Sequence, residues 1–226
     1  CVLGIVDACN TLRVPVISGN VSLYNESVTH SVYPTPLIGM VGLIDDLAHI
    51  TTQWFKQAGD VILLAGDTKQ KPDIGGSEYL KAIHGKVAGK GPRLDLQQEK
   101  KLHGFLLKAI SSKLVKSAHD CAEGGLAVAL AECCISGPQR LGAEIDAAKL
   151  PGRPDFKLFA ENQSRVIISC KPSAVVRLKK LAKQEGVGLE KLGIVGGKEL
   201  AIKGLVTLPA AELRQTWENA IPKHMA

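Results

Sequence analysis

The sequence lacks two features that would have pointed to common classes of partner. It contains no apolar run of membrane-spanning length and no secretory signal, so we expect a cytoplasmic protein that makes no membrane contact. Only 4% of its 226 residues are aromatic, and the basic residues are spread along the chain rather than interleaved with stacking side chains. Nucleic-acid-binding surfaces combine clustered basic residues with aromatic residues that stack on bases. The composition therefore argues against a nucleic-acid partner.

The sequence also lacks a CxxC pair, a heptad pattern, tandem repeats and low-complexity segments. Of its six cysteines, Cys133 and Cys134 are adjacent in an apolar helical stretch, and we expect reduced, buried thiols. An N-terminal Cys1 raises the alternative of an amine-assisted nucleophile. The chain opens inside a helical pattern without a preceding cap, which favours a cut end instead.

What is present is typical of a globular chain with a substantial core. Hydrophobic residues make up 45% and charged residues 22% of the sequence, and the formal net charge is +6. A positive net charge is compatible with anionic ligands such as nucleotides and sugar phosphates.

The apolar periodicity predicts α/β or α+β architecture, because strands and helices alternate. Before residue 55 we expect a helix over residues 1–12 and strands at Val14–Ile17 and Leu37–Ile44, the second entered through Pro34 and Pro36. After Gly59 we expect a new unit. Its expected strands are residues 61–65, 143–145, 166–170, 193–195 and 200–202, the last two joined as a hairpin by Gly196-Gly197.

Helices are expected between these strands, each with a recognisable start or end. Ser77 is expected to cap a helix over 78–84, and Ser173 one over 174–185. The helix over 95–112 has Leu96, Leu102, Leu106, Leu107 and Ile110 as its apolar set, and the last helix, 209–220, is expected to end before Pro222.

One polar stretch directly follows the predicted strand at Val14–Ile17. Gly19 admits a ligand close to the backbone, Asn20 and Asn25 offer amide oxygens, and hydroxyl and carboxylate groups surround them. Hard oxygen ligands of this kind suit Mg²⁺ and phosphates. A plain turn that leaves the strand is the alternative. The stretch reads Ser18-Gly19-Asn20-Val21-Ser22-Leu23-Tyr24-Asn25-Glu26.

Two further polar stretches each have a structural and a functional interpretation. Asp120 and Glu123 fit a capping box for a helix over 122–134; its N-terminus could instead hold an anion, and His119 with the two carboxylates could hold a metal. Before the strand at 166–170, a polar cluster is either a junction held by an Arg165–Glu161 pair or the edge of a ligand site.

Three motifs in order resemble those of phosphoribosylformylglycinamidine synthase, also called formylglycinamide ribonucleotide amidotransferase, along the length of the chain. The first is the stretch over residues 18–26. The other two are Pro34-Thr35-Pro36-Leu37-Ile38-Gly39-Met40-Val41-Gly42 and Ser117-Ala118-His119-Asp120-Cys121-Ala122-Glu123-Gly124-Gly125-Leu126-Ala127.

The resemblance implies a division of the chain and a set of site residues. Residues 1–55 would be the truncated tail of an N-terminal-type subdomain. Residues 56–226 would be a C-terminal subdomain like that of aminoimidazole ribonucleotide synthetase, with a mixed sheet flanked by helices. By motif match Gly19 would contact ATP, Asn20 would coordinate Mg²⁺ and Ser22 would touch the substrate. The residues that are either structural or line an auxiliary nucleotide site are Asp120, Glu123, Gly124 and Glu161.

The resemblance also implies the reaction. In the family, ATP activates formylglycinamide ribonucleotide and glutamine-derived ammonia gives formylglycinamidine ribonucleotide, ADP and phosphate, with separate glutaminase and small bridging subunits in the small-type enzyme. The acidic Mg²⁺ ligands and the catalytic histidine belong to the other half, so no catalytic residue is expected here and the chain alone is expected to be inactive. The alternatives are another ATP-dependent enzyme of the superfamily and a non-catalytic nucleotide-binding or interaction module. Unpaired strand edges in the first 55 residues predict self-association.

Overall fold

A computed structural model describes residues 1–22, 26–33 and 35–225. The chain divides into two units, Cys1–Leu47 and Ala48–Ala226. The expected boundary between family subdomains, near residue 55, stays a prediction. Leu23, Tyr24, Asn25 and Pro34, which belong to the motifs above, lie outside the described residues.

The first unit contains one of the three elements expected in it. Helix α1 (Val2–Leu12) forms as predicted and ends at Arg13, whose backbone is left-handed with φ 59°. The strands expected at Val14–Ile17 and Leu37–Ile44 are wrong, because both segments are irregular and, apart from the half-buried Val14, exposed.

A missing partner explains the two absent strands. A strand needs a neighbour that accepts and donates backbone hydrogen bonds. In the described part of residues 1–47 the only ladder contact is an isolated bridge between Glu26 and Ser31. The apolar side chains therefore stay in solvent: Ile17 is 90% exposed and Leu37 98%.

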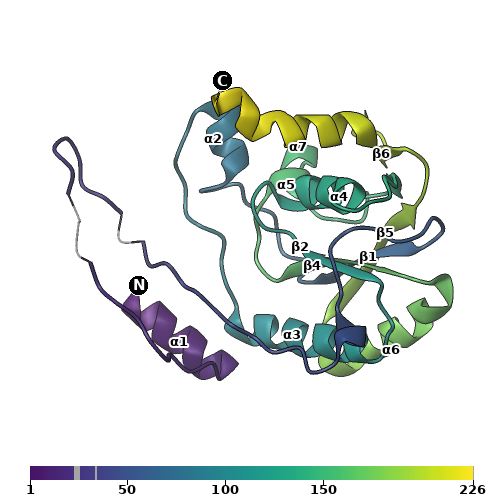
Figure 1. Ribbon diagram of the computed structural model, residues 1–226, viewed down its shortest axis with the longest axis horizontal. Coiled ribbons are helices and arrows are strands. Elements are labelled where there is room, and N and C mark those ends of the chain that lie inside the picture. Colours follow the sequence, from purple (N-terminus) through teal and green to yellow (C-terminus); the bar gives the residue numbers. More distant parts are fainter. Residues whose placement is uncertain (23–25, 34, 226) are drawn as a thin grey trace. The chain divides into compact units, whose positions relative to one another are not determined.

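The second unit is a seven-stranded sheet with helices on both faces (Figure 1). Strand order is β2-β4-β1-β5-β3-β6-β7, and every neighbouring pair is antiparallel except β3 with β6. The predicted class, a mixed sheet flanked by helices, is confirmed. The elements are β1 (Val61–Gly66), α2 (Glu78–His84), α3 (Leu96–Ser111), β2 (Ser117–Asp120), α4 (Gly125–Ile135), β3 (Ala143–Ile145), α5 (Pro154–Phe159), β4 (Arg165–Cys170), α6 (Val175–Glu185), β5 (Gly188–Val195), β6 (Glu199–Ile202), β7 (Val206–Pro209) and α7 (Ala210–Met225).

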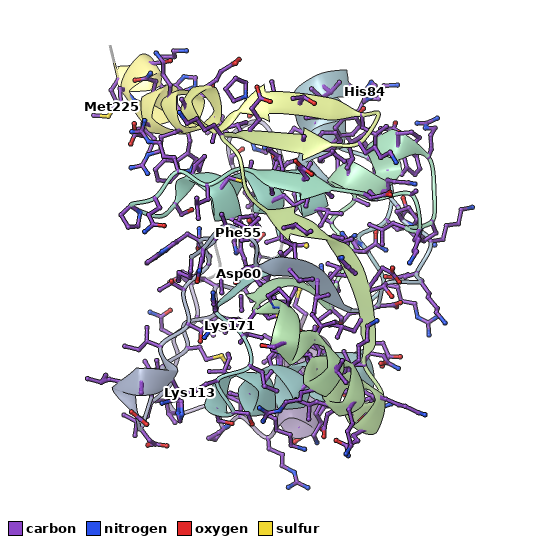
Figure 2. The ribbon with its side chains drawn as sticks, turned by 90° about the vertical axis from the view of Figure 1, so that its right-hand side faces the viewer. Phe55, Asp60, His84, Lys113, Lys171 and Met225 are labelled. Atoms are coloured by element: carbon purple, nitrogen blue, oxygen red, sulfur yellow. The ribbon has the colours of Figure 1, made fainter. Side chains whose placement is uncertain are left out.

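Two hydrophobic clusters hold the layers together, one on each face of the central strand β1. Alternate side chains of β1 enter opposite clusters: Leu64 packs with α4 and α5, whereas Leu63 packs with α3 and α6. Figure 1 shows α4, α5 and α7 above the sheet and α3 and α6 below it. Figure 2 shows Phe55, 1% exposed, in the interior of the domain, whereas Met225 lies at the outer end of α7. Because both faces are covered, β1 reads in the sequence as a continuous apolar run.

The hairpin expected around Gly196-Gly197 is wrong, although both of its strands exist. Strand β3 inserts between β5 and β6, pairing antiparallel with β5 and parallel with β6. The glycine turn instead bonds to the residue before β3: Gly196 N donates to Gly142 O, and Gly142 N donates to Gly197 O. A local turn signal cannot reveal a strand that comes from fifty residues upstream.

Helix ends were predicted with mixed success. Ser77 caps α2 as expected, since its hydroxyl accepts a hydrogen bond from Leu80 N at 3.2 Å. Ser173 does not cap α6; it lies in a short 3-10 turn, Pro172–Ala174, that leads into the helix. Helix α7 continues past Pro222 to Met225, because this exposed last turn tolerates the loss of one backbone hydrogen bond.

Helix α3 buries a different set of side chains from the one expected. The buried residues are Leu102, Phe105 and Ala109, whereas Leu107 is exposed. Leu106 and Ile110 of the expected set are only partly buried at the margin of the same cluster. The buried face of α3 is therefore narrower than the leucine pattern of the sequence predicted.

A buried ion pair fixes the entry to the sheet. Asp60, immediately before β1, is 2% exposed, and its two carboxylate oxygens accept hydrogen bonds from Lys116 Nζ at 2.6 and 2.9 Å. Figure 2 marks the position of Asp60 within the domain. The same ammonium group donates to Gln57 Oε1 at 2.9 Å. The pair joins the segment before β1 to the segment before β2.

Replacing Lys116 with methionine is expected to lower the free energy of unfolding by about 3–5 kcal/mol, because a buried carboxylate loses its partner. Urea unfolding measures the loss, and Lys179→Met on an exposed face of α6 is the control. The double variant Asp60→Asn/Lys116→Met should cost less than the sum of the two single variants. Additive losses would contradict the assignment.

Candidate functional site

The motif that resembles the ATP and Mg²⁺ region lies on exposed, irregular backbone. Gly19, Asn20 and Ser22 are all exposed, and no strand precedes them. A Cβ added to Gly19 would meet no atom within 4 Å. Among the described residues, nothing in the first unit packs over this glycine, so its backbone is open to a ligand.

Asn20 fits a magnesium site as one ligand only. Its side-chain amide oxygen is a hard, neutral donor of the kind Mg²⁺ accepts. No group of three His, Cys, Asp or Glu side chains within residues 1–22, 26–33 and 35–225 is arranged to hold a metal ion. Any Mg²⁺ at Asn20 would therefore need its negative ligands from phosphates or from another polypeptide segment.

The second candidate region lies where β2 leads into α4, and here the predicted capping box is wrong. Asp120 is the last residue of β2, opposite Val166 of β4, and Cys121 N continues the ladder by donating to Arg165 O. The backbone of Asp120 is thus part of the sheet. Helix α4 begins at Gly125, after Gly124 at φ 77°, so adjacent left-handed glycines rather than a capping side chain make the turn.

Glu161 anchors that turn from across the domain. One carboxylate oxygen, Oε1, accepts hydrogen bonds from Gly124 N and from Glu78 N, both at 2.9 Å. The first orders the β2–α4 turn and the second satisfies a free amide in the first turn of α2. Glu161 therefore makes structural contacts in the fold, and its part in an auxiliary nucleotide site stays a prediction.

The junction before β4 is not held by the expected Arg165–Glu161 pair. The Arg165 guanidinium is buried and donates to Ala160 O at 2.6 Å and Asn162 O at 3.3 Å. Its burial lowers the pKa of this guanidinium. Asn162 in turn accepts from Asp73 N, so the junction is fixed by bonds to backbone atoms. Such bonds leave little trace in a sequence, because any residue supplies the backbone partner.

Residues from the β2–α4 turn and from the junction before β4 line a polar cavity of about 270 Å³. Four carboxylates surround it, from Glu99, Asp120, Glu123 and Glu161. Glu99 is engaged by Ser164 Oγ and, at 2.9 Å, by His103 Nε2. Ser164 belongs to the polar cluster singled out before β4, whereas Glu99 was not expected here, because it lies 65 residues away in the sequence and carries no motif.

The cavity favours cations over free anions. Its carboxylates outnumber its one guanidinium, which is already bonded to carbonyl groups. Burial raises the pKa of the Cys121 thiol to about 12, so this cavity-lining thiol stays protonated and unreactive at neutral pH. A phosphate would enter this cavity only with a metal cation.

His119 lies beside the cavity between two carboxylates. Its Nε2 is 2.8 Å from Glu132 Oε2 and its Nδ1 is 3.5 Å from Asp120 Oδ1. The Glu132 carboxylate on α4 therefore links the helix to strand β2 through this ring. Both ring nitrogens face protein carboxylates, an arrangement that orients the ring within the fold.

Comparison with known families decides the class of the second unit. Residues 57–203 match the family described as AIR synthase related protein, C-terminal domain. The chain belongs to this family. The match covers the whole sheet except β7, together with α2 through α6, so the AIR synthase related C-terminal domain contains both the Asp60–Lys116 pair and the Glu161 anchor.

Curated relatives extend the similarity beyond the AIR synthase related C-terminal domain. The chain is 47% identical over 229 residues to phosphoribosylformylglycinamidine synthase subunit PurL of Anaeromyxobacter sp. (strain Fw109-5), covering 98% of this chain. It is 44% identical to the subunit of the same name from Moorella thermoacetica, over the full chain. The resemblance inferred from the three motifs is confirmed. The chain spans about 30% of the length of these relatives.

Solved structures show the same fold at lower identity. Thermotoga maritima PurL complexed with FGAR matches 74% of this chain with a TM-score of 0.64 and 21% identity, and the chain covers 29% of that protein. The T. maritima PurLQS structure matches the same share with a TM-score of 0.61 and 21% identity, over 28% of that chain. Within the described part of the chain, no helix is both long and apolar enough to cross a membrane.

Proposed function

We propose that this chain is a C-terminal part of a phosphoribosylformylglycinamidine synthase. The parent enzyme is an ATP-dependent ligase that converts formylglycinamide ribonucleotide, ATP and glutamine-derived ammonia to formylglycinamidine ribonucleotide, ADP and phosphate. The observation that carries the proposal is the 47% identity to a synthase subunit across 98% of the chain. Relatives in T. maritima have been solved with ATP, ADP, AMPPCP and FGAR, which supports nucleotide and substrate binding by the parent.

In this proposal the chain positions ligands and supplies no catalytic residue. Gly19 contacts ATP with its open backbone, Asn20 gives Mg²⁺ one amide oxygen and Ser22 meets the substrate. Mg²⁺, when bound, offsets phosphate charge during phosphoryl transfer. The exposure of all three residues supports the proposal, because residues on one side of a ligand site must be accessible to the ligands and to the residues of the other side. In this proposal the isolated chain is inactive, because the acidic Mg²⁺ ligands and the catalytic histidine of the site come from the other half of the parent enzyme.

The proposed partners are a glutaminase subunit and a small bridging subunit, with the cytoplasm as the compartment. The solved PurLQS assembly of T. maritima supports a multi-subunit synthase. Genetic complementation tests the proposal in a bacterium without its own synthase subunit. A chimera of the Anaeromyxobacter subunit that carries this chain in place of the matched region should restore growth without purines. A stable chimera that fails to do so would contradict the proposal.

A second candidate is a nucleotide-binding module at the cavity beside Asp120, Glu123 and Gly124. The carboxylate lining supports it, since a metal-bound nucleotide would bring the cation that this cavity favours. Calorimetric titration of Mg²⁺-ATP into the chain separates the candidates. Binding lost in Asn20→Ala places the nucleotide at the first motif, and binding lost in Glu123→Gln places it at the cavity.

The purified chain is expected to self-associate. The segments 14–17 and 37–44 expose apolar side chains and backbone groups without ladder partners in the described residues. Light scattering should show a mass that rises with concentration, and the double variant Ile17→Lys/Val41→Lys should lower it. A constant monomer mass across concentrations would contradict this expectation.

A further inference from the structure

A second cavity, also bordered by Asp120, is lined by two large aromatic side chains. It has a volume of about 550 Å³, and both tryptophans of the chain, Trp54 and Trp217, line it. The walls come from the segment before β1, strand β2, the end of α4 and helix α7. Its volume lies within the range of roughly 300–1,000 Å³ that is usual for small-molecule sites.

The two tryptophans play different parts in this cavity. Trp54 is fixed: Lys56 Nζ lies 3.7 Å from its ring centroid, and a Cβ on Gly137 would come within 2.4 Å of its ring. Trp217 on α7 is 59% exposed. A rigid indole and an accessible one thus share a cavity. The accessible indole offers a face on which a planar ring can stack.

The cavity carries one carboxylate that has no strong partner among the described residues. The Asp120 side chain is 73% exposed, and its one ion-pair contact is His119 Nδ1 at 3.5 Å. The other charges are matched, since His119 Nε2 meets Glu132 and Arg214 Nε donates to Glu218. Arg214 also donates to Ile135 O at the end of α4, so its guanidinium is already bonded.

The exposed Trp217 ring and the Asp120 carboxylate together indicate which class of ligand the cavity would bind. A planar ring gains from stacking on Trp217, and an exocyclic amino group on that ring gains a hydrogen bond to the Asp120 carboxylate. An anionic group is disfavoured, because the unmatched charge in the cavity is negative. An amino-substituted heteroaromatic ring satisfies both requirements.

We propose that this cavity, lined by Trp54, Trp217 and Asp120, binds an uncharged amino-substituted heteroaromatic ring, either free or as the base of a nucleoside. The site is independent of the proposed synthase function and of the Asn20 motif. It is also distinct from the cavity lined by Glu123, although Asp120 lies at the border of both.

Adenosine is the probe, and intrinsic fluorescence is the readout, because both tryptophans of the chain line the cavity. Excitation at the red edge of tryptophan absorption avoids the nucleoside's own absorption. Saturable quenching by adenosine is expected, with inosine about tenfold weaker because it lacks the exocyclic amine. ATP without Mg²⁺ should bind no more tightly than adenosine. Tighter ATP binding would show that phosphate contacts dominate and would overturn the proposal.

Variants locate the site. Trp217→Leu is expected to weaken adenosine binding about tenfold, measured through Trp54 and by calorimetry, and Asp120→Asn is expected to abolish the preference over inosine. Ile221→Ala, on the exposed side of α7, and Glu123→Gln, in the other cavity, should leave binding unchanged. Absence of saturable quenching in the wild-type chain, or unchanged binding in Trp217→Leu, overturns the proposal.

Failure of this site and failure of the proposed function are distinguishable. The synthase chimera with Trp217→Leu should still restore growth without purines, because Trp217 has no assigned part in the reaction. Loss of growth in this variant, with the chimera still folded, would contradict the independence of the two sites.

Discussion

Replacing Asn20 with alanine in the synthase chimera is expected to lower kcat/KM by about 100-fold or more. In the proposed site the amide oxygen of Asn20 is the one metal ligand that the motif supplies, and loss of even an outer contact to a metal ligand typically costs about 10–100-fold. Steady-state ADP release, measured with formylglycinamide ribonucleotide, Mg²⁺-ATP and ammonium, gives the loss. Raising the Mg²⁺ concentration should restore part of the activity, because the defect is in metal binding.

Two control variants separate this effect from misfolding. Asn10→Ala, on the exposed surface of α1, removes an amide of the same kind outside the motif and should leave kcat/KM unchanged. Asn20→Asp keeps an oxygen ligand and should retain more activity than Asn20→Ala. Equal activity of Asn20→Ala and Asn10→Ala would remove Asn20 from the site.

Gly125→Ala is expected to lower the free energy of unfolding by about 3–5 kcal/mol. The residue has φ 67°, and a Cβ there would lie 2.5 Å from Ala160 O and 2.9 Å from Phe159 C. The left-handed backbone and the clash with another backbone each cost about 1–3 kcal/mol. Neither obstacle is a side chain that can rotate away. Urea unfolding monitored by circular dichroism measures the loss.

The matched control is Gly196→Ala, where an added Cβ would meet nothing within 4 Å and the backbone is not left-handed. Its effect should stay below about 1 kcal/mol. Glu161→Gln keeps one acceptor oxygen toward Gly124 and Glu78, and should fall between the two glycine variants. A Gly125→Ala chain as stable as the Gly196→Ala chain would contradict the turn geometry.

The sequence predicted those helices and strands that are determined by neighbouring residues in the chain. Strand β1 and helix α2 follow from an apolar run and a serine cap, and both formed where expected. The elements that failed depend on distant partners. Val14–Ile17 has the composition of a strand and no neighbour in the described residues, and the Gly196-Gly197 turn gave no sign that β3 separates its strands.

The candidate sites divide in the same way. The first motif identified Gly19, Asn20 and Ser22 through resemblance, and their exposure is compatible with ligand contact. The capping role predicted for Asp120 is wrong, because its backbone belongs to a strand rather than to a helix cap, whereas its place in an auxiliary nucleotide site stays a prediction. The Trp54–Trp217 cavity was not foreseen at all, because the two residues are far apart in sequence and meet only when α7 packs against the end of α4.

The most direct measurement of the central claim is product formation by the purified chimera. With formylglycinamide ribonucleotide, Mg²⁺-ATP and ammonium present, the account predicts one ADP and one phosphate for each formylglycinamidine ribonucleotide formed, and no ADP when the ribonucleotide is omitted. The isolated chain should form none of these products. A folded chimera that releases ADP at the same rate without the ribonucleotide, or that forms no amidine, would contradict the claim that this chain belongs to the synthase.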